Sequence, residues 1–237
     1  MRNFIISKKS MQLLNDYRTS KTKGDDIEEV AKEILSNMKY EYSEIKYEMP
    51  NFQYLYGDLL VLDKDKSIKS IDIKASHTFK NIDKLGLDVR YVEKGTLKPY
   101  IPSNATTNEG YLYHLQCDSI IAINPYSKKL YIVNNFQKLK KELLKLIHLH
   151  KNKESWDILE MFFGVELAFN KTDYNKDTLV ANVDFKSMEL LGADVIELQL
   201  MQEYELRTLD YNNKFEYDIL NLDKKNTPKP TKAKSIS

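Results

Sequence analysis

Three residues of this 237-residue chain have types and spacing that could bind a divalent cation: Asp58, Asp72 and Lys74. Asp58 lies in an apolar segment that is typical of a strand, and Asp72 and Lys74 lie two residues apart in the next one. Side chains alternate between faces along a strand, so Asp72 and Lys74 should share one face of the sheet. A turn centred on Asp65 pairs residues at equal distances from it, which places Asp58 across from Asp72 with Cβ atoms about 5 Å apart.

Two like charges that face each other on an apolar sheet are unfavourable unless something offsets them. A divalent cation would do so, and because both ligands are carboxylate oxygens we expect Mg²⁺, with Mn²⁺ as a substitute, rather than zinc. Lys74 is then placed to orient or deprotonate a metal-bound water, or to balance charge at the reacting centre. The alternative is a solvated hairpin whose outer face happens to carry these three charges.

The segments around the three residues predict a mixed α/β fold. Gly24 to Asn37 has apolar residues at helical spacing and acidic residues in its first turn, which together indicate a helix. The other expected elements are strands at 40–48, 54–62, 68–74, 118–124, 129–133, 178–185 and 194–200, and helices at 7–18, 136–150 and 156–163. Their order favours a mixed β-sheet flanked by helices over an alternating βαβ array.

The segments Gly57-Asp58-Leu59-Leu60-Val61 and Ile71-Asp72-Ile73-Lys74-Ala75-Ser76 resemble the PD-(D/E)XK nuclease superfamily, which has the restriction-endonuclease-like fold. The resemblance runs from about residue 24 to about residue 133. It implies that Asp58 and Asp72 bind the metal, that the carbonyl of Ile73 completes the metal's ligands, and that Lys74 aligns the attacking water. Glu28 would correspond to the glutamate that many members carry on the preceding helix.

The acid-x-Lys triplet alone is a weak signal, because it recurs at 44–46, 184–186 and 223–225. What favours Asp72 is its apolar strand, the opposed Asp58 and the acidic helix before them. The chain departs from the family in having no proline before Asp58. It also has a long segment, 79–113, that is not part of the standard core and could carry substrate specificity.

The chain is expected to divide into four parts. These are an N-terminal helical extension (1–23), a nuclease-like core with the insertion 79–113 (24–150), an acidic α+β region packed on the core (151–222) and a disordered basic tail (223–237). Residues 1–150 carry a net charge of +5, residues 151–222 carry −8 and the tail carries +4. We therefore expect contacts with a polyanion before residue 150 and in the tail, with 151–222 facing away.

Basic and aromatic residues interleave in the insertion, which is typical of nucleic-acid contacts. Lys80, Lys84 and Arg90 are the candidate DNA contacts, and His77 could approach the phosphate or a metal-bound water. The alternative for all four is a solvated loop surface.

Composition narrows the function classes. The single cysteine, Cys117, excludes an intramolecular disulfide and a cysteine-rich zinc site. Glycine-rich phosphate loops are missing from the sequence, which argues against a nucleotide hydrolase or a dinucleotide enzyme. No segment approaches eighteen continuous apolar residues, so we expect no membrane partner and a cytoplasmic protein.

These observations lead to an expected function. The chain should be a metal-dependent deoxyribonuclease, an endonuclease of a restriction type or of a recombination or repair type, that acts on DNA with Mg²⁺. One alternative is a nuclease-fold protein that binds nucleic acid or a protein partner without cleaving, with 151–222 as the protein-binding surface. Another alternative is an RNA nuclease. For each of these functions, a homodimer is one possible oligomeric state.

Overall fold

The computed structural model describes residues 2–19, 24–45, 50–63, 65–75, 83–101, 106–150, 152–171, 176–203 and 205. The expectations for His77, for Lys80 and for the tail 223–237 lie outside the described residues. The chain divides into two compact units, Met1–Gln202 and Glu203–Ser237, and every element described below belongs to the first.

The larger of two sheets has seven strands in the order β1-β10-β7-β6-β4-β3-β2. Their bounds are Arg2–Ile5 (β1), Asp194–Met201 (β10), Lys129–Asn134 (β7), Ser119–Asn124 (β6), Ile68–Ala75 (β4), Leu59–Leu62 (β3) and Glu41–Glu44 (β2). β1 pairs with β10 and β4 with β6 in parallel, and the other neighbours are antiparallel. The fold is therefore mixed α/β, with a mixed sheet as expected.

The smaller sheet is antiparallel, with three strands in the order β5-β9-β8. Their bounds are Lys84–Glu93 (β5), Lys176–Asp184 (β9) and Val165–Lys171 (β8). β5 lies in the segment 79–113 that was expected to be an insertion or loop, and it pairs with β9 almost throughout. The register shifts between Asp88 and Arg90, where a bulge bends the strand.

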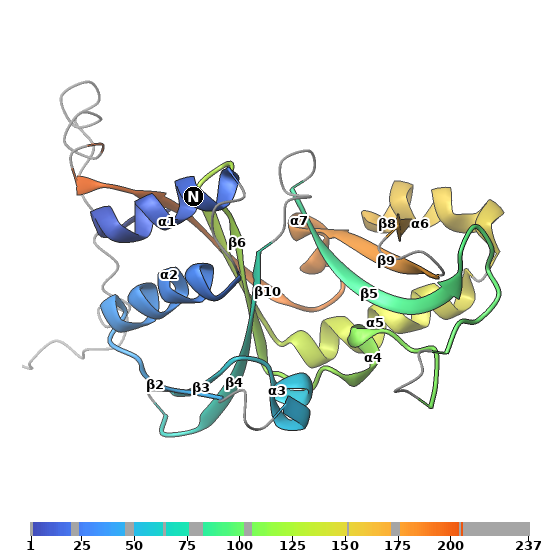
Figure 1. Ribbon diagram of the computed structural model, residues 1–237, viewed down its shortest axis with the longest axis horizontal. Helices are drawn as coiled ribbons and strands as arrows, with labels where there is room; N and C mark the ends of the chain where they lie inside the picture. Colours follow the sequence, from blue (N-terminus) through green and yellow to red (C-terminus); the bar gives the residue numbers. More distant parts are fainter. Residues whose placement is uncertain are drawn as a thin grey trace, which may run out of the picture. The chain divides into compact units, whose positions relative to one another are not determined.

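Eight helical elements accompany the two sheets in the described residues. They are α1 (Lys8–Arg18), α2 (Gly24–Asn37), α3 (Pro50–Tyr56), α4 (Tyr111–His114), α5 (Phe136–Leu149), the 3₁₀ turn η2 (Lys153–Ser155), α6 (Trp156–Phe163) and α7 (Phe185–Met188). Figure 1 shows α1 and α2 on one side of this sheet and α4, α5 and the smaller sheet on the other. One continuous apolar core joins that smaller sheet to β6, β7 and α5, so the two sheets are parts of one packed body.

The helix expected at 24–37 is confirmed as α2, and its apolar stripe is the buried face. Ile27, Val30, Ala31 and Ile34 are each 1% exposed or less, so α2 is held to the sheet by apolar packing. This packing also brings Glu28, one turn into α2, within electrostatic reach of Asp58 at the β3–β4 hairpin.

The strand expected at 54–62 is wrong in its first half, because residues 50–56 form the helix α3. Pro50 suits a first helical turn, and Phe52 and Tyr56 meet four residues apart with ring centroids separated by 4.6 Å. The strand β3 begins only at Leu59.

The parts expected at 1–23 and 151–222 both contribute strands to the sheets that residues 24–150 also form. β1 is an edge strand of the larger sheet, and α1 is tied to α2 because the Ser7 hydroxyl donates to Glu33 over 2.6 Å. β10 lies inside the larger sheet, between β1 and β7, and β8 and β9 complete the sheet that β5 begins. The strands of the segment 165–201 are therefore built into both sheets.

Among the residues that the structure describes, there is no helix long and apolar enough to cross a membrane.

Candidate functional site

The β3–β4 hairpin has the register that the sequence predicts. Leu59 pairs with Ile71, and the Asp58 N–H donates to the carbonyl of Ile71 over 2.9 Å. Continuing the register by one residue places Asp58 opposite Asp72. Asp58 is half-buried, whereas Asp72 is only 1% exposed.

Gly57 makes this close approach possible. Its φ is +87°, and a Cβ at this position would lie 2.7 Å from both the Cα of Asp72 and the carbonyl oxygen of Ile71. A larger residue would both strain the backbone and push the chain away from β4. The glycine thus sets Asp58 beside β4.

Asp72 is the centre of the site. Its Oδ1 accepts a hydrogen bond from the Tyr111 hydroxyl over 2.7 Å and another from Lys74 Nζ over 3.1 Å. Its Oδ2 lies 2.9 Å from Lys74 Nζ but accepts no well-directed hydrogen bond from any described residue. Because a buried carboxylate oxygen without a hydrogen bond is costly, Oδ2, which has only the ion pair with Lys74, is a candidate ligand position in a buried setting.

Asp58 is fixed by two donors. Its Oδ2 accepts the N–H of Ile73 over 2.7 Å, and its Oδ1 accepts from Gln53 Nε2 of α3 over 3.2 Å. The first bond brings the backbone of Ile73, the residue expected to offer its carbonyl to a metal, next to the Asp58 carboxylate. Each Asp58 oxygen keeps a further lone pair for a cation.

Glu28 lies within electrostatic reach of Asp58. Burial, and after it the charge of the Asp58 carboxylate, together raise the pKa of Glu28 to about 7. In the described part of the chain, however, no three Asp, Glu, His or Cys side chains form a group that could hold a metal. The expected convergence of Glu28, Asp58 and Asp72 on one ion is therefore replaced by a carboxylate pair with Glu28 beside Asp58.

Lys74 is held as a cation. Burial alone would lower its pKa, but the adjacent Asp72 carboxylate outweighs this and keeps the pKa above its ordinary value. Its Nζ also lies 4.3 Å from the centroid of the Tyr111 ring, a cation–π contact. A protonated lysine can donate hydrogen bonds but cannot accept a proton, so of the three expected roles, orienting a water and balancing charge fit, and deprotonating the water does not.

Tyr111 is a site residue that the sequence does not reveal. Its ring lies under Lys74, its hydroxyl bonds Asp72, and burial raises its pKa so that it stays a donor. Gly110 places it, because a Cβ there would lie 2.5 Å from the carbonyl oxygen of Asp88. Nothing local distinguishes Tyr111 from the other members of a set of 16 tyrosines.

Asp88 of β5 also belongs to the surroundings of the site. Burial raises its pKa, while the nearby Lys74 and Lys176 lower it. β5 thus brings a further carboxyl group toward Lys74, at the bulge of this strand.

The expected DNA contacts on β5 have different surroundings. Lys84 Nζ lies 3.0 Å from a Glu160 oxygen and 3.1 Å from a Glu166 oxygen, so a phosphate would have to displace two carboxylates. The Nε of Arg90 is buried and bonds to none of the described residues. Arg90 therefore keeps one buried donor without a hydrogen bond among the described residues, and Lys84 is paired with carboxylates.

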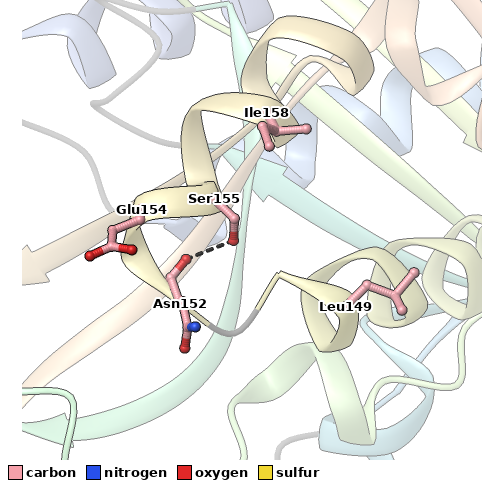
Figure 2. A pocket seen from close by; sticks show the side chains of 5 residues that line it. All are labelled: Leu149, Asn152, Glu154, Ser155 and Ile158. Atoms are coloured by element: carbon pink, nitrogen blue, oxygen red, sulfur yellow. Dashed lines mark hydrogen bonds between the residues drawn. The ribbon is translucent and has the colours of Figure 1, made fainter.

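A hollow at the end of α5 is separate from these residues. Figure 2 shows its lining, Leu149, Asn152, Glu154, Ser155 and Ile158, where the Ser155 hydroxyl donates to the carbonyl of Asn152 over 2.7 Å. No candidate residue is part of it, so the site lies in the hairpin and not in this hollow.

The donor set fits a hard divalent cation. Asp58 and Asp72 offer only oxygen ligands, and the Oδ2 of Asp72 is buried without a hydrogen bond. Comparisons of the chain with protein-family models, with curated proteins and with solved structures gave no match.

Proposed function

We propose that this chain is a Mg²⁺-dependent nuclease of restriction-endonuclease-like fold that hydrolyses DNA phosphodiester bonds. The observation that carries the proposal is the Asp58–Asp72 pair across the hairpin, with Lys74 bound to Asp72. Opposed carboxylates with a lysine two residues on are the arrangement that the PD-(D/E)XK resemblance implies. The mixed sheet with helices on both faces supports the same fold.

Each residue would have a distinct role. Asp58 and Asp72 would hold Mg²⁺, or Mn²⁺ in its place, together with the carbonyl of Ile73. When bound, the metal supplies polarisation of the scissile phosphate and a lowered pKa for water. Lys74, whose side chain is 32% exposed, would donate a hydrogen bond from its ammonium group to the attacking water or to a phosphate oxygen.

Supporting side chains would keep these groups in place. Tyr111 fixes both Asp72 and Lys74 through its hydroxyl and its ring. Glu28 would help to position the metal or the water from the side of Asp58. Arg90 would contact the DNA backbone beyond the bulge of β5.

Cleavage assays test the proposal. Duplex, single-stranded and branched DNA, and RNA of the same sequence, are incubated with Mg²⁺, with Mn²⁺ and with a chelator. We expect metal-dependent cleavage that falls on the order of 10²-fold or more in Asp72→Asn and in Lys74→Ala. The matched controls Asp63→Asn and Lys69→Ala remove an ion pair at the other end of the hairpin and should keep activity. Activity that survives both site substitutions would sink the assignment.

A second candidate is a nuclease-fold protein that binds nucleic acid without cleaving it. The observation that favours it is the lack of a three-ligand metal group in the described residues, with Lys74 already neutralising Asp72. Titration calorimetry with Mg²⁺ and Mn²⁺ separates the two. Binding that is lost in Asp58→Asn supports the nuclease, and no binding to the wild-type protein supports the second candidate.

A further inference from the structure

Three aromatic rings form a cluster beside the Asp72–Lys74 pair. The ring of Tyr54 on α3 lies 5.3 Å from that of Tyr111 and 5.5 Å from that of His114, both on α4. Tyr111 is the residue whose hydroxyl bonds Asp72, so a single ring separates Tyr54 from the buried carboxylate. We call Tyr54, Tyr111 and His114 the aromatic cluster.

The outer members of the aromatic cluster are open to solvent. Tyr54 is 42% exposed and the His114 side chain is 35% exposed, whereas Tyr111 beneath them is largely covered. A backbone hydrogen bond lies below the cluster: the N–H of Gln116 donates to the carbonyl of Leu55 over 2.5 Å and joins α3 to the segment that follows α4. The cluster is a fixed ring surface with one side available to a ligand.

The composition of α3 supports a binding role. Its seven residues include three aromatic side chains, and none of the seven is charged. A surface helix normally carries charged residues, and exposed aromatic side chains that gather in one place mark a binding surface. Phe52, beside Tyr56 on α3, is 41% exposed and extends the aromatic surface.

The charges around the cluster select the kind of ligand. Asp88 and Glu109 lie within electrostatic reach of Tyr54 and would repel a phosphate placed over its ring. An uncharged nucleobase would not be repelled. The cations lie to the side, with Lys74 over the Tyr111 ring and Lys176 over the Tyr91 ring. The cluster therefore fits a base, and the neighbouring cations fit the phosphates on either side of it.

A base can offer its flat face to Tyr54 only when it is unpaired. In a continuous duplex the bases are stacked inside and the phosphates face outward, so duplex DNA would turn its charged surface toward Asp88 and Glu109. An unpaired nucleotide can rotate its base onto an aromatic ring.

We propose that Tyr54 and His114 stack on an unpaired base next to the phosphate bound at Asp58, Asp72 and Lys74. The substrate class is then a nucleic acid with unpaired nucleotides, such as a single strand or a branch point, rather than continuous duplex. This inference rests on the proposed function, because that function places the phosphate.

Binding without metal tests the inference separately from cleavage. Fluorescence anisotropy in a chelating buffer compares a labelled unstructured DNA strand, its duplex, a duplex with a single-stranded extension and an RNA strand of the same sequence. We expect the single strand and the extended duplex to bind about tenfold tighter than the plain duplex. Whichever of the DNA strand and the RNA strand binds more tightly is identified as the preferred type of nucleic acid.

Substitutions at Tyr54 locate the contact. Tyr54→Leu keeps apolar volume against Tyr111 but removes the flat ring, and we expect it to weaken single-strand binding about 5-fold to 100-fold without changing duplex binding. Tyr54→Trp should restore the affinity. Phe162→Ala, which removes an exposed ring on α6, is the matched control and should have no effect.

Three results would overturn the inference: equal affinity for single strand and duplex, an equal loss for both in Tyr54→Leu, or single-strand binding weaker than roughly 10⁻⁴ M, the weak limit of non-specific binding. Its failure is distinguishable from failure of the proposed function. Selective single-strand binding without any Asp72-dependent cleavage supports base stacking on the aromatic cluster and contradicts the proposed nuclease function. Asp72-dependent cleavage of duplex DNA that is unchanged in Tyr54→Leu supports the nuclease function and contradicts base stacking on the aromatic cluster.

Discussion

At the residue scale, the buried carboxylate of Asp72 depends on two neighbours of different kinds. Lys74 balances its charge at 2.9 Å, and Tyr111 donates a directed hydrogen bond at 2.7 Å. Removing a hydrogen bond to a buried charged group costs more free energy than removing a hydrogen bond between neutral groups, because water cannot solvate the buried charge in its place. Tyr111 should therefore contribute to stability as well as to the geometry of the site.

Tyr111→Phe removes the hydroxyl and keeps the ring under Lys74. We expect the free energy of unfolding to fall by about 1.5–3 kcal/mol, the worth of a hydrogen bond to a charged group. Urea denaturation followed by circular dichroism measures the change. Tyr113→Phe, two residues along on the same short helix, is the control and should change stability by less than about 0.5 kcal/mol. Equal stability of Tyr111→Phe and wild type would contradict the role assigned to the hydroxyl.

Glu28 gives a prediction about pH. Burial and the Asp58 charge raise its pKa from 4.5 to about 7, so between these values the unfolded chain releases the proton while the folded protein keeps it. Stability therefore falls as pH rises through this window, and the loss is complete above it. In metal-free buffer Glu28→Gln should match the wild type near the bottom of the window and melt at a higher temperature above pH 7. A difference in Tm that does not change with pH would contradict this.

The acidic pair and its lysine could be predicted from the sequence because they depend on local rules. Alternation along a strand and symmetry about the turn fix Asp58 opposite Asp72 without knowledge of the rest of the fold. Tyr111 reaches Asp72 across 39 positions of sequence, and Asp88 depends on a bulge in a strand that the sequence did not show. Contacts of this kind follow from tertiary packing, so no local sequence pattern predicts them.

At the element scale, the hairpin depends on Gly57 in two ways, through its positive φ and through the space next to Asp72. Gly57→Ala should lose stability from strain, about 1–3 kcal/mol, and a further amount from the clash with the backbone of β4. Gly95→Ala is a matched control, because Gly95 also has a positive φ, +71°, but no atom lies within 4 Å of the added Cβ.

Chemical denaturation of the two variants separates strain from clash. Gly57→Ala should be clearly less stable than Gly95→Ala, and it should also weaken Mg²⁺ binding because Asp58 moves. Similar losses in both variants, with unchanged metal affinity, would show that the close approach to β4 is not what requires the glycine.

Elements were predictable where their signal is local. α2 and α6 have the expected bounds, because their apolar spacing is complete within each segment. α3 was missed because seven residues with alternating tyrosines fit a strand as well as a helix. β5 was missed because its stabilising partner, β9, is far along the chain, and a strand's pairing cannot be read from one side of the pair.

At the scale of the whole molecule, the elements after residue 150 are needed to complete both sheets. A fragment of residues 1–150 lacks β8, β9 and β10, so β7 loses a neighbour and β5 loses its sheet. We expect this fragment to show no cooperative thermal transition by circular dichroism. A fragment of residues 1–202 keeps every strand of both sheets and should melt cooperatively. Cooperative melting of 1–150 would restore the domain boundary that the sequence suggested.

The net charge of the segments also changes meaning at this scale. The acidic composition of 151–222 suggested a region remote from any polyanion. In the structure, β9 of that region runs beside β5, and its Lys176 lies over the Tyr91 ring next to the site. When strands from both halves of the chain share a sheet, the net charge of a sequence segment is thus a poor guide to where charges lie in the folded protein.

The pairing of β1 with β10 has a consequence for how the protein is made. Arg2 pairs with Leu198, so one of the first strands synthesised waits for one of the last. At about 5–20 residues per second this wait is roughly 10 to 40 s. During that time the edge of β1 and the apolar side of α1 have no finished sheet to cover them. The nascent chain therefore has a period of exposure in which chaperones would be expected to bind its N-terminal segment.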